Sequence, residues 1–164
     1  MNEEKLIQRD RMRFVKNSMC ANLCYLGLLF DVFYFVLLYR RDEAAPYYYT
    51  IQIGASIVYN LLFLLIVFLS SEGVKNYGKS YSYILLVAGV MQIVRIFVIP
   101  WNAHSTPIDP EDVQSLMVMT DAHFLRCTVY LIISAVCLIV SAVVNIMRCN
   151  TLEAHNKYLE SQKA

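Results

Sequence analysis

The sequence is poor in the residues that build soluble catalytic sites. It has only five glycines in 164 residues, and none of them forms a glycine-rich loop of the kind that cradles phosphate groups. It has no CxxC motif, and its three histidines do not combine with a serine or a cysteine into a catalytic set. The formal net charge of +1 gives no reason to expect nucleic acid as a partner. We therefore expect no enzyme, no cofactor and no bound metal.

The chain also lacks a polar segment long enough to form a soluble domain. Hydrophobic residues make up 58% of it and charged residues 16%. A helix of about 20 residues crosses a bilayer core about 30 Å thick, and it satisfies its own backbone hydrogen bonds there. Four apolar stretches reach this length, namely residues 18–39, 51–70, 81–101 and 125–147. The sequence predicts an all-α integral membrane four-helix bundle with up-down-up-down order, in a single transmembrane domain spanning residues 1–164.

Positive charges are unevenly distributed among the segments that connect these spans. Ten lie before the first span, between the second and third, or after the fourth: Lys5, Arg9, Arg11, Arg13, Lys16, Lys75, Lys79, Arg148, Lys157 and Lys163. The other side has only Arg40, Arg41 and Arg126. Because lysine and arginine accumulate on the cytoplasmic side, the N-terminal segment 1–17 and the C-terminal segment 148–164 are both predicted to be cytoplasmic. We expect a multi-pass protein of the plasma membrane.

The beginning of the chain has two features that affect this prediction. A basic segment before an apolar one can be a secretory signal, but the run 18–39 is too long for one, contains Asp31 and ends in two arginines. We expect it to be retained as the first helix, with residues 1–17 running into it as one helix. Their basic side lies either against anionic lipid or, as we favour, in solvent.

The longest connector on the opposite side, residues 102–124, is rich in acidic residues and histidines. Within it, Asp109 and Pro110 are typical of a helix start, which predicts a short surface helix between the third and fourth spans. Capping then explains most of the acidic residues. A weaker alternative is a membrane sensor in which His104, Asp121 and His123 bind a metal ion.

Each predicted span carries one stripe of small and polar residues at helical spacing. Such stripes face neighbouring helices in membrane proteins, because small residues allow close approach and polar ones form hydrogen bonds between helices. Cys20 and Cys24 belong to a stripe, so we interpret them as packing residues rather than a metal or redox pair. The stripes are Cys20, Cys24, Gly27, Asp31 and Tyr34; Gln52, Ser56, Tyr59 and Asn60; Gly89, Gln92 and Arg95; and Ser134, Cys137, Ser141, Asn145 and Arg148.

Asp31 and Arg95 are the full charges well inside the spans. At 1.5 Å per residue, Asp31 lies about 12 Å and Arg95 about 9 Å from the outer ends of their spans, which is nearly the same depth. A lone charge there costs at least about 2.5–3.5 kcal/mol. We therefore predict an ion pair, direct or bridged by water, that joins the first and third helices. Tyr34 and Gln92 are placed to satisfy its remaining hydrogen-bonding groups.

Two functions are compatible with this pair. We favour a structural clamp inside a non-enzymatic accessory or interaction subunit of a membrane assembly, whose partners are the lipid bilayer and either another membrane protein or a second copy of the chain. The alternative is a small transporter or channel, in which Asp31 titrates and Arg95 holds an anion. Asn60, Gln92, Tyr34 and Asn145 then line a pathway, and otherwise they make hydrogen bonds between helices.

Overall fold

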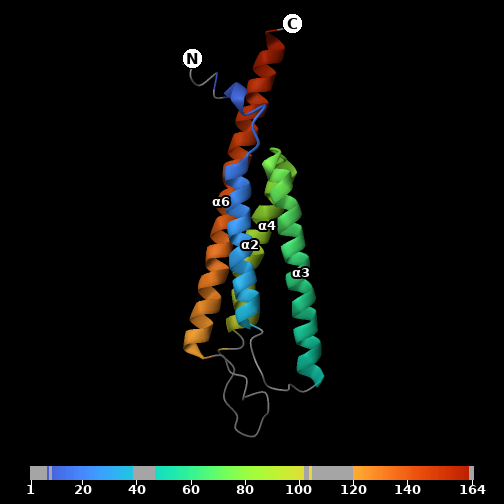
Figure 1. The fold of residues 1–164 in the computed structure, drawn as a ribbon, viewed down its shortest axis with the longest axis vertical. Coiled ribbons are helices and arrows are strands. Elements are labelled where there is room, and N and C mark those ends of the chain that lie inside the picture. Colours follow the sequence, from blue (N-terminus) through green and yellow to red (C-terminus); the bar gives the residue numbers. More distant parts are fainter. Residues whose placement is uncertain (1–6, 8, 39–46, 102–103, 105–119, 163–164) are drawn as a thin grey trace.

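The computed structural model describes residues 7, 9–38, 47–101, 104 and 120–162, with the backbone alone at residues 47–53 (Figure 1). Its long helices are α2 (Ser18–Leu38), α3 (Tyr47–Lys75), α4 (Lys79–Ile96) and α6 (Asp121–Ser161), and a π-helical turn η1 (Phe97–Trp101) extends α4. All four long helices are long and apolar enough to cross a membrane. The prediction of an all-helical chain with four candidate spans is therefore confirmed for the described residues.

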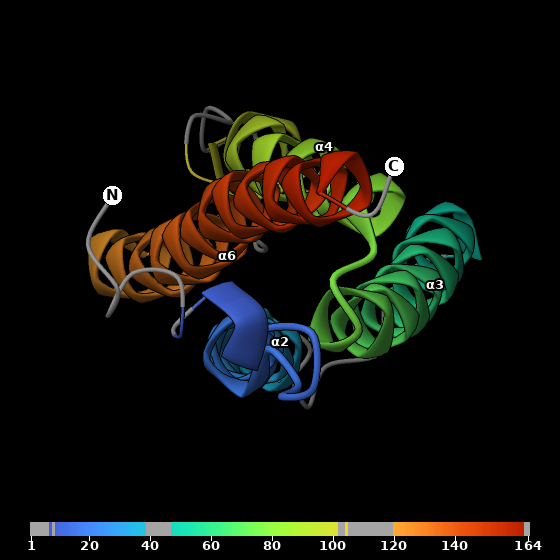
Figure 2. The same ribbon diagram turned by 90° about the horizontal axis from the view of Figure 1, so that it is seen from above.

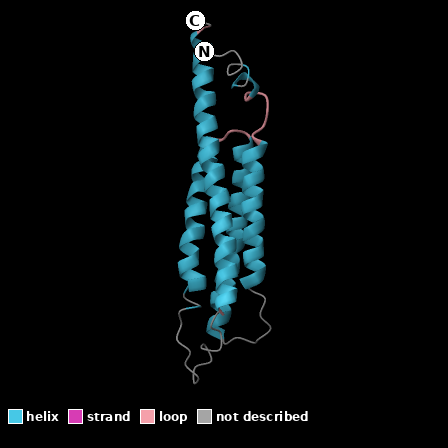
Figure 3. Ribbon diagram, turned by 90° about the vertical axis from the view of Figure 1, so that its left-hand side faces the viewer, coloured by secondary structure: helices cyan, strands magenta, loops and turns pink. Residues whose placement is uncertain are grey.

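Helix α6 makes its most extensive contacts with α2 and α4, whereas α3 packs against α2 and α4. Figure 2 shows α3 standing apart from α6. At one end, the backbone amide of Asn17 donates to the carbonyl of Lys75 at 2.9 Å, and Lys79 forms a 3.4 Å salt bridge with Glu153. The start of α2, the α3–α4 junction and the last third of α6 therefore meet there. Figure 3 shows α6 continuing beyond the other helices at this end.

More polar side chains are buried, and more large apolar side chains are exposed, than in a typical soluble protein. Buried positions include Asp31, Asn60, Gln92 and Arg95, while large apolar side chains such as Val87 and Leu61 are more than half exposed. A soluble chain rarely exposes so much contiguous apolar surface, because water penalises it. This arrangement suits a lipid environment, where the outer faces meet hydrocarbon and polar groups are buried between helices.

Small residues bring α6 close to its two main neighbours. A Cβ atom added at Gly27 of α2 would lie 3.2 Å from the carbonyl oxygen of Ser134, and one added at Gly89 of α4 would lie 2.6 Å from Cγ1 of Ile139. Side chains at these two positions would push the helices apart. The glycines thus allow the close backbone approach on which helix packing in lipid depends.

Helices α3 and α4 are joined by a tight turn with an unusual residue. The amide of Gly78 donates to the Gly73 carbonyl at 2.9 Å, and the amide of Tyr77 donates to the Val74 carbonyl at 3.0 Å. This is the hydrogen-bond pattern of a Schellman motif, in which the left-handed position is usually glycine. Here Tyr77 occupies it with φ 58°. The turn therefore places a large aromatic side chain where the backbone disfavours one.

Pro100 explains why α4 ends at Ile96 and a π-helical turn follows. A proline has no amide hydrogen, and its ring clashes with the carbonyl four residues earlier in an α-helix. The wider π turn Phe97–Trp101 contains Pro100 and so accommodates the ring. The predicted span 81–101 is consequently helical throughout but changes its winding near the end.

The structure corrects one expectation, and another falls outside the described residues. Residues 12–15 form turns and a bend and residues 16–17 have no regular structure, so the N-terminal segment does not run into α2 as one helix. The reason is Asn17, whose backbone and side chain are drawn into contacts with α3 and α6. The predicted surface helix around Pro110 lies outside the described residues. The C-terminal segment continues α6 as a helix to Ser161.

Candidate functional site: a buried polar layer

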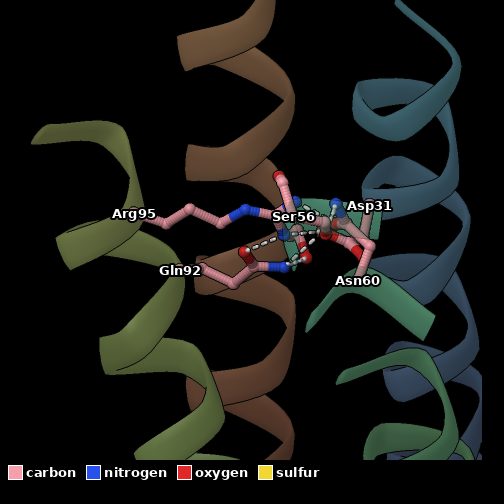
Figure 4. A network of polar contacts seen from close by, with 6 residues as sticks. Asp31, Ser56, Asn60, Gln92 and Arg95 are labelled. Atoms are coloured by element: carbon pink, nitrogen blue, oxygen red, sulfur yellow. Dashed lines mark hydrogen bonds and ion pairs between the residues drawn. The ribbon is translucent and has the colours of Figure 1, made fainter. Parts of the chain in front are cut away.

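The four long helices each place a polar side chain at one level of the structure (Figure 4). We call this set the polar layer, and it consists of Asp31 from α2, Asn60 from α3, Gln92 and Arg95 from α4, and Ser134 from α6. All five side chains are buried, and Arg95 is the most exposed of them at 4%. The stripes read from the sequence predicted these faces: Cys20, Cys24, Gly27, Asp31 and Tyr34 are buried in α2, and Gly89, Gln92 and Arg95 in α4.

The two charged groups meet directly. One guanidinium nitrogen of Arg95 (Nη1) lies 3.0 Å from Oδ1 of Asp31. The side-chain amide of Gln92 donates to the same carboxylate oxygen at 2.7 Å and reaches Oγ of Ser134 at 3.3 Å. The structure thus shows the direct contact rather than a water bridge, and Gln92 extends it from α2 to α6.

Arg95 also connects to α3. Its second terminal nitrogen (Nη2) donates to Oδ1 of Asn60, and the Asn60 amide group in turn donates to the Ser56 carbonyl at 2.9 Å. The guanidinium carbon lies 4.4 Å from the ring centroid of Tyr34 and 5.3 Å from that of Tyr59. Cation–π contacts of this kind stabilise a desolvated guanidinium by about 2 kcal/mol. Tyr34 therefore contributes the face of its ring to the charge.

Apolar side chains close the polar layer on both sides. Toward the Asn17 end lies a core cluster that includes Cys24, Phe63, Ala88 and Leu138. Toward the opposite end lies a second cluster formed by Tyr34, Ile96, Cys127 and Leu131. The charges therefore sit in a low-dielectric layer between two apolar ones, where electrostatic attraction is strong and an unpaired charge is costly.

Two atoms of the ion pair make no hydrogen bond to the described residues, namely Oδ2 of Asp31 and Nε of Arg95. A buried carboxylate oxygen without a donor carries a desolvation penalty of about 1–3 kcal/mol or more. The Asp31 carboxylate is thus held tightly through Oδ1. Its other oxygen, Oδ2, can still accept a proton or a hydrogen bond.

A second polar network lies at the Asn17 end, and we call it the end network: Asn17, Ser82, Asn145 and Arg148. Asn145 accepts from the Asn17 amide at 2.6 Å and donates to Oγ of Ser82 at 2.7 Å. Arg148 donates to Oδ1 of Asn17 at 2.5 Å. Sequence reasoning identified Asn145 and Arg148 but missed Asn17 and Ser82. Asn17 directly before an apolar span was a usable signal, because asparagine is common at helix starts.

The remaining candidates are placed as follows. The five cysteines are buried and unpaired by disulfides, and Sγ of Cys24 lies 3.0 Å from Oγ of Ser141, within a helix contact. His104 and Asp121 form a 2.7 Å contact between ring nitrogen and carboxylate. No group of three or more metal-ligating side chains occurs among the described residues. Most of the acidic connector, and the side chain of Gln52, lie outside them.

Comparison of the chain with protein-family models, with curated proteins and with solved structures finds no match. Its function must therefore be inferred from its own residues.

Proposed function

We propose that this chain is an integral membrane protein whose four helices alternate in direction across the bilayer, with both termini in the cytoplasm, and that it serves as an accessory or interaction subunit of a larger membrane assembly. The contacts of Asn17 with Lys75 and of Lys79 with Glu153 support the alternation, because each joins the start of one helix to the end of the next. The clustering of basic residues in segments 1–17 and 148–164 supports the orientation.

The polar layer supports a structural role for Asp31 and Arg95. Arg95 touches both α2 and α3, and Gln92 touches both α2 and α6, so two residues of α4 hold all of the other helices. The apolar clusters on either side of the layer favour a structural clamp over a pathway for solutes. The observation that carries the proposal is that the buried polar side chains of the layer bond to one another across all four helices, with only Oδ2 of Asp31 and Nε of Arg95 unbonded among the described residues. The outer faces of the helices are then left for partners.

A groove between α3 and α4 is the surface on which we place a partner. It has a volume of about 540 Å³ and is lined by Tyr59, Leu62, Phe63, Ile66, Tyr83, Ile84, Val87, Ala88 and Met91. These residues extend over about 10–12 Å of each helix, which is about two turns of a transmembrane helix that lies along the groove. Tyr59, which faces Arg95, forms part of the wall. We propose that a transmembrane helix of another protein occupies the groove.

A bulky substitution in the groove tests this proposal. Val87 is 59% exposed, so Val87→Trp is expected to fill the groove without removing buried contacts. The matched control is Val136→Trp on α6, a residue that is 54% exposed and outside the groove. After purification in a mild detergent, a stoichiometric partner is expected with the parent and with Val136→Trp, and to be lost with Val87→Trp. A lone homo-oligomer in all three preparations would contradict the proposal.

Transport is the second candidate, and the unbonded Oδ2 of Asp31 favours it. In that function the carboxylate exchanges protons or contacts a solute, and Asn60 and Gln92 line the route. Removal of the Asp31 charge distinguishes the two functions. If the ion pair is a clamp, the protein loses stability, and if the protein is a transporter, it loses flux.

A further inference from the structure

A strongly basic pocket lies at the Asn17 end, where α2 begins. It has a volume of about 610 Å³, and its charged lining consists of Arg9, Arg11 and Lys16 from the N-terminal segment and Arg148 from α6. No acidic residue is among the lining residues. We call it the basic pocket.

The acidic side chains near these residues are engaged elsewhere. Asp10 forms a 3.3 Å salt bridge with Arg13 and lies 3.7 Å from the ring of His155. The Glu72 carboxylate is attracted by the charge of Lys16. Its hydrogen bonds, however, come from Tyr25 at 2.5 Å and from Lys75 at 3.1 Å. The positive charge of the pocket is therefore not neutralised by its described neighbours, and it attracts an anion.

Parts of the pocket wall are held in place. Arg148 donates to Asn17 at 2.5 Å and approaches Sδ of Met19 at 3.3 Å, which fixes the direction of its guanidinium group. Tyr77, whose φ is 58°, also lines the pocket. A non-glycine residue in this left-handed region is strained, and such strain concentrates at functional sites. Its carbonyl is held by the thiol of Cys149 at 3.1 Å.

Exposed apolar side chains also line the pocket or lie next to it in the sequence. Val15 and Met19 line it and are 49% and 53% exposed, and the neighbouring Phe14 is 80% exposed. Ser18 and Met19 begin α2, so the pocket lies at the edge of a candidate membrane span. Four cations beside exposed apolar side chains match an amphiphile that has an anionic head and hydrocarbon chains. A soluble phosphate would use the cations but not these apolar side chains.

We propose that the basic pocket binds the phosphate headgroup of an anionic phospholipid that carries at least two negative charges. Arginine binds phosphate oxygens through paired N–H groups, which suits Arg9, Arg11 and Arg148. The acyl chains then follow the exposed side of Met19 along α2. Basic pockets at the ends of membrane helices are suited to such headgroups. The inference depends on the membrane location of the chain and is independent of the partner proposed for the α3–α4 groove.

Native mass spectrometry of the full chain in detergent, titrated with cardiolipin or with neutral phosphatidylcholine, tests the proposal. The variant Arg9→Gln/Arg11→Gln/Lys16→Gln removes three cations from exposed or half-exposed positions. Each such residue contributes a factor of about five to binding of an anionic lipid surface, so cardiolipin affinity is expected to fall about 100-fold. The control Lys79→Gln/Arg126→Gln/Lys157→Gln has the same change in charge outside the pocket lining, leaves the Asp10–Arg13 salt bridge in place, and is expected to bind cardiolipin as the parent does.

A second variant and a competition experiment keep the test decisive. Thr151→Glu places a carboxylate in the pocket wall from α6 and is expected to weaken cardiolipin binding without altering the N-terminal segment. Equal loss of cardiolipin in both triple variants would show that net charge alone matters and would overturn the proposal. Displacement of cardiolipin by inorganic phosphate at comparable concentration would assign the site to a soluble anion and would also overturn it.

Discussion

Replacing Asp31 by asparagine is expected to lower the free energy of unfolding by about 3–5 kcal/mol, because it leaves the guanidinium charge of Arg95 buried without its counter-ion. Arg95→Gln is expected to have an effect of similar size, since it strands the carboxylate and also removes the hydrogen bond to Asn60. The double variant removes both charges and is expected to be more stable than either single variant. Chemical unfolding in mixed micelles, followed by circular dichroism, measures all four proteins.

The controls for this cycle are charged residues on the surface. Arg126→Gln and Glu153→Gln each remove one exposed charge and are expected to change stability by no more than about 0.5 kcal/mol. Additive losses in the double variant would show that Asp31 and Arg95 are not coupled. If Asp31→Asn is as stable as the parent but loses a proton or solute flux that the parent shows in proteoliposomes, the clamp is wrong and the transporter is favoured.

The second large effect is expected at Asn145 in the end network. Asn145→Leu removes a hydrogen bond to Asn17 and another to Ser82, and both of these side chains are buried. Leaving buried polar groups without partners costs about 1–3 kcal/mol. We expect a loss within this range, measured by the same unfolding experiment.

The matched control is Asn150→Leu, which introduces the same side chain at an exposed position of the same helix. It is expected to leave stability nearly unchanged. Ser82→Ala serves as a graded variant, since Asn145 keeps its contact with Asn17 there, and it is expected to lose less than Asn145→Leu. An Asn145→Leu variant as stable as Asn150→Leu would mean that the end network contributes little to the fold.

The four candidate membrane spans could be predicted from the sequence because lipid restricts a chain to few solutions. Span length follows from bilayer thickness, and polar residues such as Asp31 and Gln92 point inward because hydrocarbon excludes them. The Asp31–Arg95 contact was predicted from the opposite charges of the two residues, their matched depth and the cost of a lone charge in hydrocarbon. The depth of a residue in its span does not predict how many neighbouring helices its side chain contacts. The contact between Arg95 and Asn60 was therefore seen only in the structure.

The ends of the helices were less predictable, because they depend on contacts between distant parts of the sequence. The N-terminal segment has the composition of a helix, yet it breaks before Ser18 because Asn17 bonds to Lys75 and to Asn145. The left-handed backbone at Tyr77 could not be anticipated either, since glycine is the residue expected there. The sequence pattern of Asp31 and Arg95 fits both a structural clamp and a transporter, so it does not decide between these two functions.

The most direct test of the central claim is the separation between the Asp31 carboxylate and the Arg95 guanidinium group in a lipid bilayer. Solid-state nuclear magnetic resonance, with a ¹³C-labelled carboxylate and ¹⁵N-labelled arginine, measures their dipolar coupling, and Arg95→Gln identifies the signal. The 3.0 Å contact between Nη1 and Oδ1 predicts a measurable carbon–nitrogen coupling that disappears in Arg95→Gln. A spectrum of the parent with no such coupling would show that the two charges lie apart, and it would contradict the clamp.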